Sequence, residues 1–349
     1  MTNNTVINKT VTNNTVINNT ADSDTATADT RLYVIHENPD WYAPLAAAFD
    51  QAGVPHEQWL LGDAVVDLEE EPPAGLFWSR MSASAHTRGH PFAKDQTRGV
   101  LAWLEAHGRR VVNGRHVLDL EMSKVEQLAA LRAAGFDVPR TVAVAGPSGL
   151  AAAARKIPVP FISKHNQGGK GLGVRLFTSH DEYDSYLAGP DYEPPVDGIT
   201  LLQEYLVAAQ PRITRAEIVG GEFVYAITAD TDRGGFQLCP ADACAVPTAG
   251  GPRAGGPGVP EPSLFRLRAG FSDPVIGRYL DFASAHGIGI AGFEFIETAD
   301  GRLVTYDINT TTNYNAEIEA VAPRSALAAV ASYLGGLLAG SARSRRPGN

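Results

Sequence analysis

A β-hairpin predicted near the C-terminus constrains this chain more than any other segment. Two runs of strand-forming residues, AGFEFIETA and RLVTYDIN, flank Asp300-Gly301, a dipeptide that strongly indicates a two-residue hairpin turn. With that turn, Glu294 lies directly opposite Asp307 on the neighbouring strand. Because two carboxylates in a cross-strand pair repel each other, the hairpin is destabilised unless they are neutralised.

A divalent cation between the two carboxylates would remove this repulsion. Asn309 follows Asp307 by two residues and so lies on the same face. Glu294, Asp307 and Asn309 offer only oxygen ligands, which suit Mg²⁺, an ion that keeps several waters and is shared with substrate phosphates. Glu297 falls on the opposite face and is a poorer ligand candidate. The alternative interpretation is a solvated hairpin whose acidic residues are incidental.

A glycine-rich loop between two predicted strands indicates phosphate binding. Residues 161–174 read FISKHNQGGKGLGV, with Lys164 at the end of the first strand. Glycines allow backbone N–H groups to approach phosphate oxygens, and a lysine here can reach a phosphate. No GK[ST] opens a helix, so the loop is not a P-loop, and the HRD and DFG motifs of protein kinases are absent. A flexible surface loop is the alternative.

Two other patterns carry less weight. Residues 287–292 match GxGxxG, but they follow a predicted helix and enter a strand, the reverse of the context that dinucleotide binding requires. Cys239 and Cys244 form a single CxxxxC pair, and the nine histidines show no HExxH spacing. An NAD-dependent oxidoreductase, a zinc enzyme and a disulfide scaffold are therefore disfavoured.

Strands and helices alternate from Arg31 onward, which is typical of an open α/β layer. Predicted strands cover Leu32–His36, His56–Leu61, Gly75–Ser79 and Val111–Val112. Predicted helices run from Asp40, as the cap, to Gly53 and over Gln96–His107. This first block is one domain long.

Two further blocks follow. Ser123 and Glu126 form a capping box that opens the second block, which has strands over 159–164 and 174–177 and another capping box at Ser179. The third block contains a strand at Thr200–Tyr205, a hairpin at Gly220-Gly221, a helix capped by Ser272 that ends at His286, the acidic hairpin and a C-terminal helix.

The first thirty residues differ from the rest of the chain. They begin with an imperfect duplication, MTNNTVINKT and VTNNTVINNT, whose Asn and Thr side chains compete with regular backbone bonding. We expect residues 1–30 to be a disordered tail outside the fold. No basic and then apolar signal segment is visible, so the N-x-T triplets of the repeat are interpreted as coincidental and the expected location is the cytoplasm.

Charge excludes several classes of partner. The chain has 29 Lys and Arg against 39 Asp and Glu, a net charge of −10. This balance argues against nucleic acids and anionic membranes, whose binding depends on neutralising phosphates. The apolar stretch at 326–339 is interrupted by polar residues and glycines and is shorter than a membrane span. Small-molecule substrates are therefore expected, and a homo-oligomer is left open.

Six short segments carry further information through their order. They are SRMSASAHTRG (79–89), VN (112–113), SK (123–124), LQEYL (202–206), Arg215 before Gly220-Gly221, and YDIN (306–309). Together they resemble the ATP-grasp superfamily of carboxylate–amine ligases, nearest to the ribosomal-protein glutamate ligases and glutathione-synthetase-like enzymes. The resemblance covers about Phe77–Glu319.

The resemblance implies a fold and its division into domains. The fold is α/β of the ATP-grasp type, in which a Rossmann-like N-terminal domain precedes two α+β subdomains that clamp ATP. The expected limits are 31–120 for the N-terminal domain, 121–198 for the central lid subdomain and 199–345 for the C-terminal subdomain with the metal site.

The resemblance also implies a role for each matching residue. The ATP phosphates are expected on Lys124, Lys164, Gly168, Gly169, Lys170, Gly171 and Gly173, and adenine on Glu204, Tyr205 and Leu206. Mg²⁺, or Mn²⁺ in its place, is expected on Glu294, Asp307 and Asn309. Arg215 would face the transferring phosphoryl group as the catalytic residue. The substrate is expected on Arg80, Ser82, Ser84 and Asn313, with an ion pair as the alternative for Arg80 and a polar turn as the alternative for Asn313.

The sequence departs from the family pattern at two places. Asp307 replaces the usual Glu, which shortens the ligand arm and keeps its charge. The segment Phe236–Cys244 replaces an FRSN-like strand, which disfavours a ribosomal-protein substrate. The expected activity is ATP-dependent joining of two small amino acids through an acyl phosphate, with glutamate as the carboxyl donor and a dipeptide or γ-glutamyl product. A small-metabolite kinase and a non-catalytic nucleotide-binding regulator are the alternatives.

Overall fold

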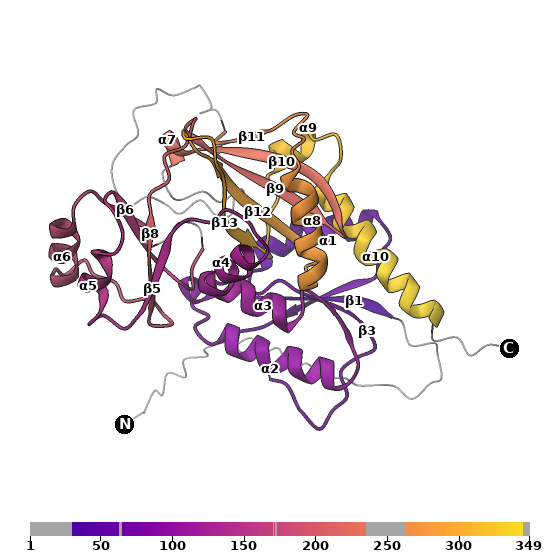
Figure 1. The fold of residues 1–349 in the computed structure, drawn as a ribbon. Coiled ribbons are helices and arrows are strands. Elements are labelled where there is room, and N and C mark those ends of the chain that lie inside the picture. The colour runs from indigo at the N-terminus through magenta and orange to yellow at the C-terminus, as the bar shows by residue number, and fades with distance from the viewer. Residues whose placement is uncertain (1–29, 63–64, 170, 172, 235–262, 345–349) are drawn as a thin grey trace, which may run out of the picture.

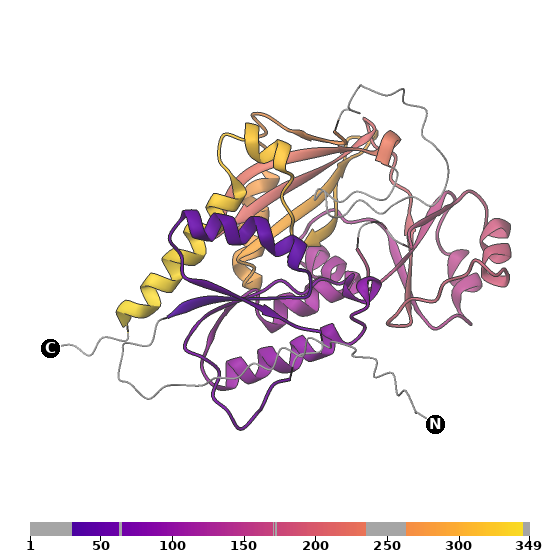
Figure 2. The ribbon, with the colours of Figure 1, turned by 180° about the vertical axis from the view of Figure 1, so that it is seen from behind.

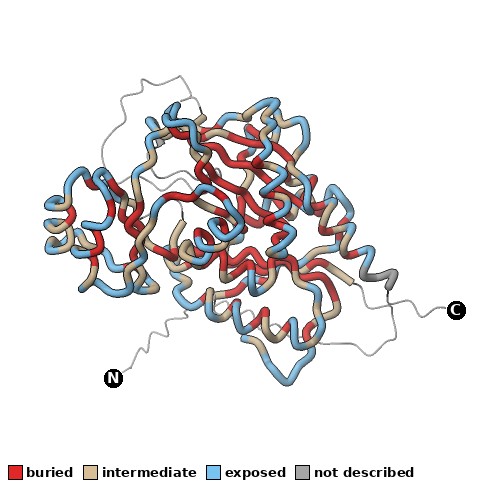
Figure 3. Tube along the Cα trace, viewed as in Figure 1, coloured by how far each residue is buried: buried red, intermediate tan, exposed pale blue. Residues whose placement is uncertain are grey.

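Three β-sheets organise the protein (Figure 1). The computed structural model describes residues 30–62, 65–169, 171, 173–234 and 263–344, without the side chains of 233–234 and 341–344. The N-terminal repeat, Lys170, both cysteines and the Phe236–Cys244 segment lie outside these ranges. Buried residues follow the strands of all three sheets (Figure 3).

The first sheet is parallel, as the alternation of strands and helices predicts. Its strand order is β2-β1-β3-β4, formed by β1 (Arg31–His36), β2 (His56–Leu60), β3 (Gly75–Ser79) and β4 (Arg110–Val112). Every residue of β3 is buried, which is typical of a parallel strand covered on both faces. Helix α1 (Pro39–Gln51) covers one face of the sheet and α2 (Ala93–Ala106) the other (Figure 2).

The cap predicted for the first helix is wrong by two residues. Asn38, not Asp40, is the N-cap, because its side chain accepts a hydrogen bond of 3.1 Å from the backbone N–H of Asp40. Asp40 instead lies in the first turn, where its negative charge interacts favourably with the helix dipole.

The second sheet is antiparallel and stands to one side of the molecule (Figures 1 and 2). Its order is β5-β8-β6-β7, formed by β5 (Thr141–Ala145), β6 (Phe161–His165), β7 (Arg175–Phe177) and β8 (Ile199–Glu204). Helices α5 (Leu150–Ala154) and α6 (His180–Ala188) pack on it through Leu150, Phe161 and Tyr183. Ser179 caps α6 as predicted. Strand β8 pairs with β5 and β6 in this sheet, whereas the expected boundary at residue 199 assigned it to the C-terminal subdomain.

The third sheet is antiparallel with the order β11-β10-β9-β12-β13. Its strands are β9 (Arg212–Val219), β10 (Glu222–Asp230), β11 (Phe265–Leu267), β12 (Ile290–Glu297) and β13 (Leu303–Asn309). Gly220 and Gly221 both have positive φ, 62° and 80°, as the predicted two-residue turn requires. Helix α8 (Val275–His286) packs on the sheet, and the side chain of Asp273 rather than Ser272 accepts from its first N–H, at 2.8 Å.

Further helices join the first and third sheets into one body. Helix α3 (Arg115–Met122) was not predicted from the sequence, and it precedes α4 (Lys124–Ala133). Residues of both helices share a core with Tyr279 of α8 and Phe293 of β12. The C-terminal α10 (Ala326–Ser344) packs on α1, β3 and β9. The shorter segments are η1 (Ala85–Arg88), α7 (Thr231–Gly234) and α9 (Ala316–Val321). No helix in the described part of the chain combines the length and apolarity that crossing a bilayer requires.

The acidic hairpin has a longer turn than the sequence predicted. Thr298 and Arg302 pair across a three-residue loop, with Gly301 at φ 85°, so the expected two-residue turn is wrong. That change alone would place Glu294 opposite Tyr306. A β-bulge between Glu294 and Phe295 restores the register, so Glu294 still pairs with Asp307. At a bulge two residues oppose one, and Tyr306 and Asp307 therefore both face Glu294.

Candidate functional site

A cavity of about 660 Å³ lies between the second and third sheets, with one end at the loop after β3. Most of the predicted site residues line it: Ser82, Ser84, Lys124, Lys164, Gly168, Gly169, Gly171, Glu204, Tyr205, Leu206, Arg215, Glu294, Asp307, Asn309 and Asn313. Arg80 and Gly173 do not line this cavity, and Lys170 lies outside the described residues. The cavity has the size of a small-molecule binding site.

The carboxylate pair on β12 and β13 brings two acidic groups close together inside the protein. Glu294 is buried, and burial together with the neighbouring Asp307 raises the pKa of its carboxyl group above the ordinary value. Tyr306 donates its hydroxyl to Oε2 of Glu294, and Nδ2 of Asn309 donates to Oε1, both at 2.8 Å. These bonds orient Glu294 and turn the Oδ1 side of the Asn309 amide away from it.

Two lysines face the carboxylates from opposite walls of the cavity. Lys124, in the first turn of α4, forms an ion pair with Asp307. Lys164, at the end of β6, is only 6% exposed and has no ion pair within the described residues. Burial, and then the charge of Lys124, lower the pKa of Lys164 to about 7. A buried cation without a partner is costly, so this site favours an anionic ligand beside Lys164.

Arg215 is held in place by the strand next to the carboxylate pair. Its Nε lies 2.7 Å from Glu217, two residues along β9, and its Nη1 lies 3.8 Å from Glu294. Thr312 links Arg215 to Glu217, since its hydroxyl contacts the Arg215 guanidinium and donates to Glu217 at 2.9 Å. Nearby carboxylates keep the pKa of Arg215 above its ordinary value despite burial. The guanidinium is a fixed positive charge at the cavity wall.

Arg80 lies behind the wall rather than in the cavity. Its Nη2 donates to the carbonyl of Thr312 at 2.9 Å and to Oδ1 of Asn313 at 3.1 Å, and no carboxylate in the described residues pairs with it. Burial lowers its pKa to about 10, so it remains charged at neutral pH. The alternative ion pair is absent among the described residues, and Arg80 is not one of the residues that line the cavity. The geometry instead makes Arg80 a support for Thr312 and Asn313, which do line the cavity.

The far end of the cavity is apolar. Ile162 and Val174 come from the second sheet and its glycine-rich loop, and Ile296 comes from the hairpin. Glu204, Tyr205 and Leu206 leave β8 at the same end, where the chain passes between the sheets. Two apolar walls and a strand end of this kind suit a flat aromatic ring.

Several residues at the site were not predicted from the sequence. They are Glu121, Gln127, Glu217, Tyr306 and Thr312. Glu217 had a detectable signal, because it alternates with Arg215 along one strand and so shares its face. Tyr306 had none, because a regular strand would turn it away from Asp307 and only the bulge brings both to one side.

The donor set fits a hard divalent cation shared with another ligand. Glu294, Asp307 and Asn309 can present two carboxylates and one amide oxygen, and Mg²⁺ characteristically takes one or two carboxylates and completes its shell with waters and phosphates. No group of three or more His, Cys, Asp or Glu side chains in the described ranges is placed to hold a metal alone. The site therefore suits a metal that arrives with a phosphate.

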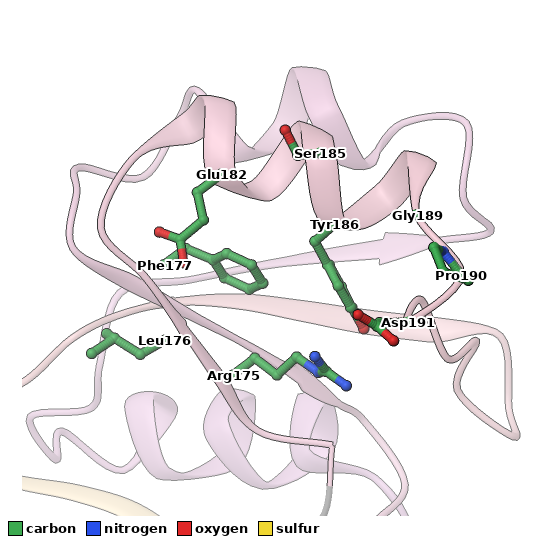
Figure 4. Close-up of a pocket in the computed structure, with 9 residues that line it drawn as sticks. All are labelled: Arg175, Leu176, Phe177, Glu182, Ser185, Tyr186, Gly189, Pro190 and Asp191. Carbon is green, nitrogen blue, oxygen red and sulfur yellow. The ribbon is translucent and has the colours of Figure 1, made fainter.

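Another pocket, of about 590 Å³, lies between β7 and α6 (Figure 4). Arg175 stacks there on the ring of Tyr186, with 4.8 Å between the guanidinium carbon and the ring centroid. It contains none of the predicted site residues, and the carboxylate pair is not part of it.

A Rossmann-like layer followed by a smaller antiparallel sheet and a larger antiparallel sheet, with a glycine-rich loop facing a carboxylate pair, defines the ATP-grasp class of folds. No family model matches the chain, and no curated protein sequence matches it. Solved structures do match over nearly the whole described chain, at identities that establish the fold alone.

Three of these structures illustrate the likeness. The RimK domain protein ATP-grasp from Sphaerobacter thermophilus DSM 20745 is 16% identical, with a TM-score of 0.60 over 87% of this chain and 99% of its own. The ATP-grasp ligase PsnB, in complex with minimal precursor, Mg and ADP, is 16% identical, with a TM-score of 0.58 over 89% and 98%. The D-cycloserine synthetase DcsG is 18% identical, with a TM-score of 0.58 over 88% and 99%. This chain has the ATP-grasp fold that its motifs predicted.

Proposed function

We propose that this protein is an ATP-dependent ligase that joins a carboxylic acid to an amine. The observation that carries the proposal is the meeting of Lys124, Lys164 and Arg215 with the Glu294–Asp307 pair in one cavity. Three cations beside two carboxylates form a site for a metal-bound polyphosphate. The similar structures named as ligases support the proposal, as does the complex of one of them with Mg and ADP.

The reaction proceeds in two transfers. A carboxylate oxygen of the first substrate attacks the γ-phosphorus of ATP, the bond to the β-phosphate oxygen breaks, and an acyl phosphate and ADP form. The nitrogen of the amine then attacks the acyl carbon, the carbon–oxygen bond to phosphate breaks, and an amide, phosphate and a proton result. Neither transfer needs a covalent enzyme nucleophile, so positioning and charge neutralisation supply the catalysis.

The residues of the cavity have distinct tasks in this scheme. Lys164 and the backbone of Gly168, Gly169 and Gly171 hold the phosphates from the lid, and Lys124 holds them from the body. Glu294, Asp307 and Asn309 would bind Mg²⁺, which offsets the charge of the polyphosphate when bound. Arg215 stabilises the charge that develops on the transferred phosphoryl group. The apolar end beside Glu204–Leu206 receives adenine.

The substrates are proposed as two small amino acids, with glutamate as the carboxyl donor. They would occupy the end of the cavity lined by Ser82, Ser84 and Asn313, whose hydroxyl and amide groups can bind carboxylate and ammonium groups. Among the similar structures, PsnB and the macrocyclase MdnC are complexed with precursor peptides. A peptide is therefore the second candidate for the acceptor.

Release of ADP in the presence of Mg²⁺ tests the proposal. We expect release to require both a carboxylic acid and an amine, and mass spectrometry of amino-acid pairs to show condensed products. A stable phosphorylated product that forms without an amine would identify a kinase instead. Product that forms only with a peptide or protein acceptor would overturn the small-molecule acceptor and retain the ligase. Binding of nucleotide without any turnover would favour a regulator.

A further inference from the structure

The metal-binding strand lies at the edge of its sheet. Among the described strands, the order β11-β10-β9-β12-β13 leaves β13 paired on one side only, and β13 carries Asp307 and Asn309. The outward backbone groups of an edge strand have no sheet partner, which leaves such a strand less constrained than a central one. Something else must hold the two side chains at the spacing that a metal requires.

Gln127 pairs with the outer edge of β13 between these two residues. Its Oε1 accepts from the backbone N–H of Ile308 at 3.0 Å, and its Nε2 donates to the carbonyl of Ile308 at 2.8 Å. The same Nε2 donates to the carbonyl of Leu120 at 2.8 Å. Gln127 is only 1% exposed. Its amide therefore takes the place of a neighbouring strand at the one residue that separates Asp307 from Asn309.

The same helix carries the phosphate-binding lysine. Gln127 lies three residues after Lys124 in α4, on the same side of the helix, and Lys124 pairs with Asp307. The start of α4 is held in turn by the lid, because Oδ1 of Asn166 accepts from the backbone N–H of Val125 at 2.9 Å. One rigid element thus connects the glycine-rich loop, the lysine and the strand with the carboxylate.

From these contacts we propose that Gln127 is a positioning residue for the metal, which fixes the separation and direction of the Asp307 and Asn309 side chains through the backbone of Ile308. The inference rests on the proposed function, since it assigns the ion of that same site. Mg²⁺ demands near-ideal octahedral geometry, whereas flexible sites suit less demanding ions. Loss of Gln127 therefore impairs Mg²⁺ more than it impairs the larger Mn²⁺.

Two substitutions test the assignment in the full-length protein. Gln127→Met keeps the side-chain volume and removes all three hydrogen bonds. Gln127→Glu keeps the side-chain shape but replaces the donor Nε2 by a carboxylate oxygen, which is repelled by the carbonyls of Leu120 and Ile308. The first measurement is direct binding of Mn²⁺ in the presence of ADP by electron paramagnetic resonance, with Mg²⁺ as competitor. We expect Mg²⁺ to bind about 10-fold to 100-fold more weakly to both variants, as is typical when an outer-sphere support is lost. The loss for Mn²⁺ is smaller.

Tyr279→Phe is the matched control. Tyr279 is fully buried and shares a hydrogen bond of 2.7 Å with Thr305, which also lies on β13 but away from the ligands. This change lowers stability while leaving Mg²⁺ affinity within about twofold of wild type, since no ligand support is lost. Equal metal affinities in the Gln127 variants and the control would overturn the assignment. Absence of metal and ADP binding in the wild-type protein would instead overturn the proposed function.

Discussion

Four charged side chains meet at the centre of the cavity: Glu294, Asp307, Lys124 and Lys164. Burial works against the charged forms of Glu294, Lys124 and Lys164, and of the four only Lys124 and Asp307 are directly paired. The pKa of Glu294 is raised and that of Lys164 is lowered, so each is shifted toward its neutral form. A metal cation bound beside Glu294 would lower the pKa of its carboxyl group, and a polyphosphate bound beside Lys164 would raise the pKa of its amine. Both shifts would thereby be reversed.

Replacement of Glu294 by glutamine is expected to impair metal-dependent turnover without lowering the stability of the metal-free protein. The amide of Glu294→Gln would keep an acceptor for Tyr306 and remove the repulsion toward Asp307, so we expect the metal-free variant to unfold no more easily than wild type. Because folding raises the pKa of Glu294, the wild-type protein loses stability as pH rises above about 4.5, the pKa of this group in the unfolded chain. The variant has no carboxyl group here and does not lose this stability. ATP turnover is expected to fall at least about 100-fold.

The free energy of unfolding in urea across pH, and ADP release, check this prediction. Glu297→Gln is the control, because Glu297 faces Arg268 at 2.9 Å on the other side of the strand. The prediction is contradicted when Glu294→Gln retains full turnover.

His36 is expected to contribute to acid sensitivity. It is 2% exposed and stacked on Tyr42, and burial followed by the charge of Arg80 lowers its pKa to about 4. A histidine with a lowered pKa stabilises fully above its unfolded value of about 6.5, and this contribution is lost as pH falls through about 4. We expect wild type to lose up to about 3 kcal/mol more than His36→Phe over this window. Denaturant unfolding at several pH values measures it, and parallel profiles would refute the role of His36.

At the scale of elements, the acidic hairpin shows how two irregularities produce a site. The three-residue loop moves the strand register by one position, and the bulge at Tyr306 moves it back. Only the combination gives Glu294 three partners from one strand: Asp307 opposite, Tyr306 beside it and Asn309 two residues on. Regular pairing would have left one of these on the far face.

The hairpin turns differ in how much room surrounds their glycines. Gly301 has φ 85° with nothing within 4 Å of an added Cβ, whereas at Gly220, with φ 62°, that atom would lie 2.5 Å from the ring of Tyr333. Gly301→Ala is expected to cost about 1 kcal/mol through backbone strain alone and to leave turnover unchanged. Gly220→Ala adds overpacking and costs about 2 to 4 kcal/mol in total. Urea unfolding compares the two, and equal losses would contradict the argument.

At the scale of the whole molecule, Asn113 connects the first sheet to the third. It follows β4 in a left-handed conformation with φ 52°. Its Nδ2 donates to the carbonyls of Ile290 and Thr310 at 2.8 and 3.3 Å. Its Oδ1 accepts from the N–H groups of Gly289 and Ile290 at 2.9 and 3.3 Å. One buried side chain thus fixes the start of β12 and the end of β13 relative to the N-terminal layer.

Substitution of Asn113 is expected to lower the free energy of unfolding of the part of the protein that contains the first and third sheets. Asn113→Ala loses four buried hydrogen bonds and strains a left-handed residue, at a cost of about 3 to 5 kcal/mol. Asn113→Gly loses the same bonds without the strain and is expected to be about 1 kcal/mol less destabilised. Urea unfolding measures both values. Identical stabilities of the two variants would show that the backbone conformation carries no cost.

Much of the fold could be predicted because its signals are local. The parallel first layer, the helix caps at Ser123 and Ser179 and the turn at Gly220-Gly221 all follow from short-range pattern and turn chemistry. Errors occurred where neighbouring residues compete for one local role, as Asn38 and Asp40 do for the first helix cap. Helix α3 was missed although its residues Val117 and Leu120 pack in the core.

The sequence by itself determined that the chain alternates strands and helices and that a glycine-rich loop follows a strand with Lys164 near its end. It also placed Glu294 and Asp307 on neighbouring strands of one hairpin, although their direct pairing depends on the bulge. Only the tertiary structure decided that Tyr306 faces Glu294, that Arg80 supports the wall instead of lining it, and that Gln127 holds β13 from a position 181 residues earlier in the chain. The reason is physical. Periodicity and turn chemistry act between neighbours, whereas a bulge, an edge-strand contact and the burial of a charge depend on which distant segments pack together.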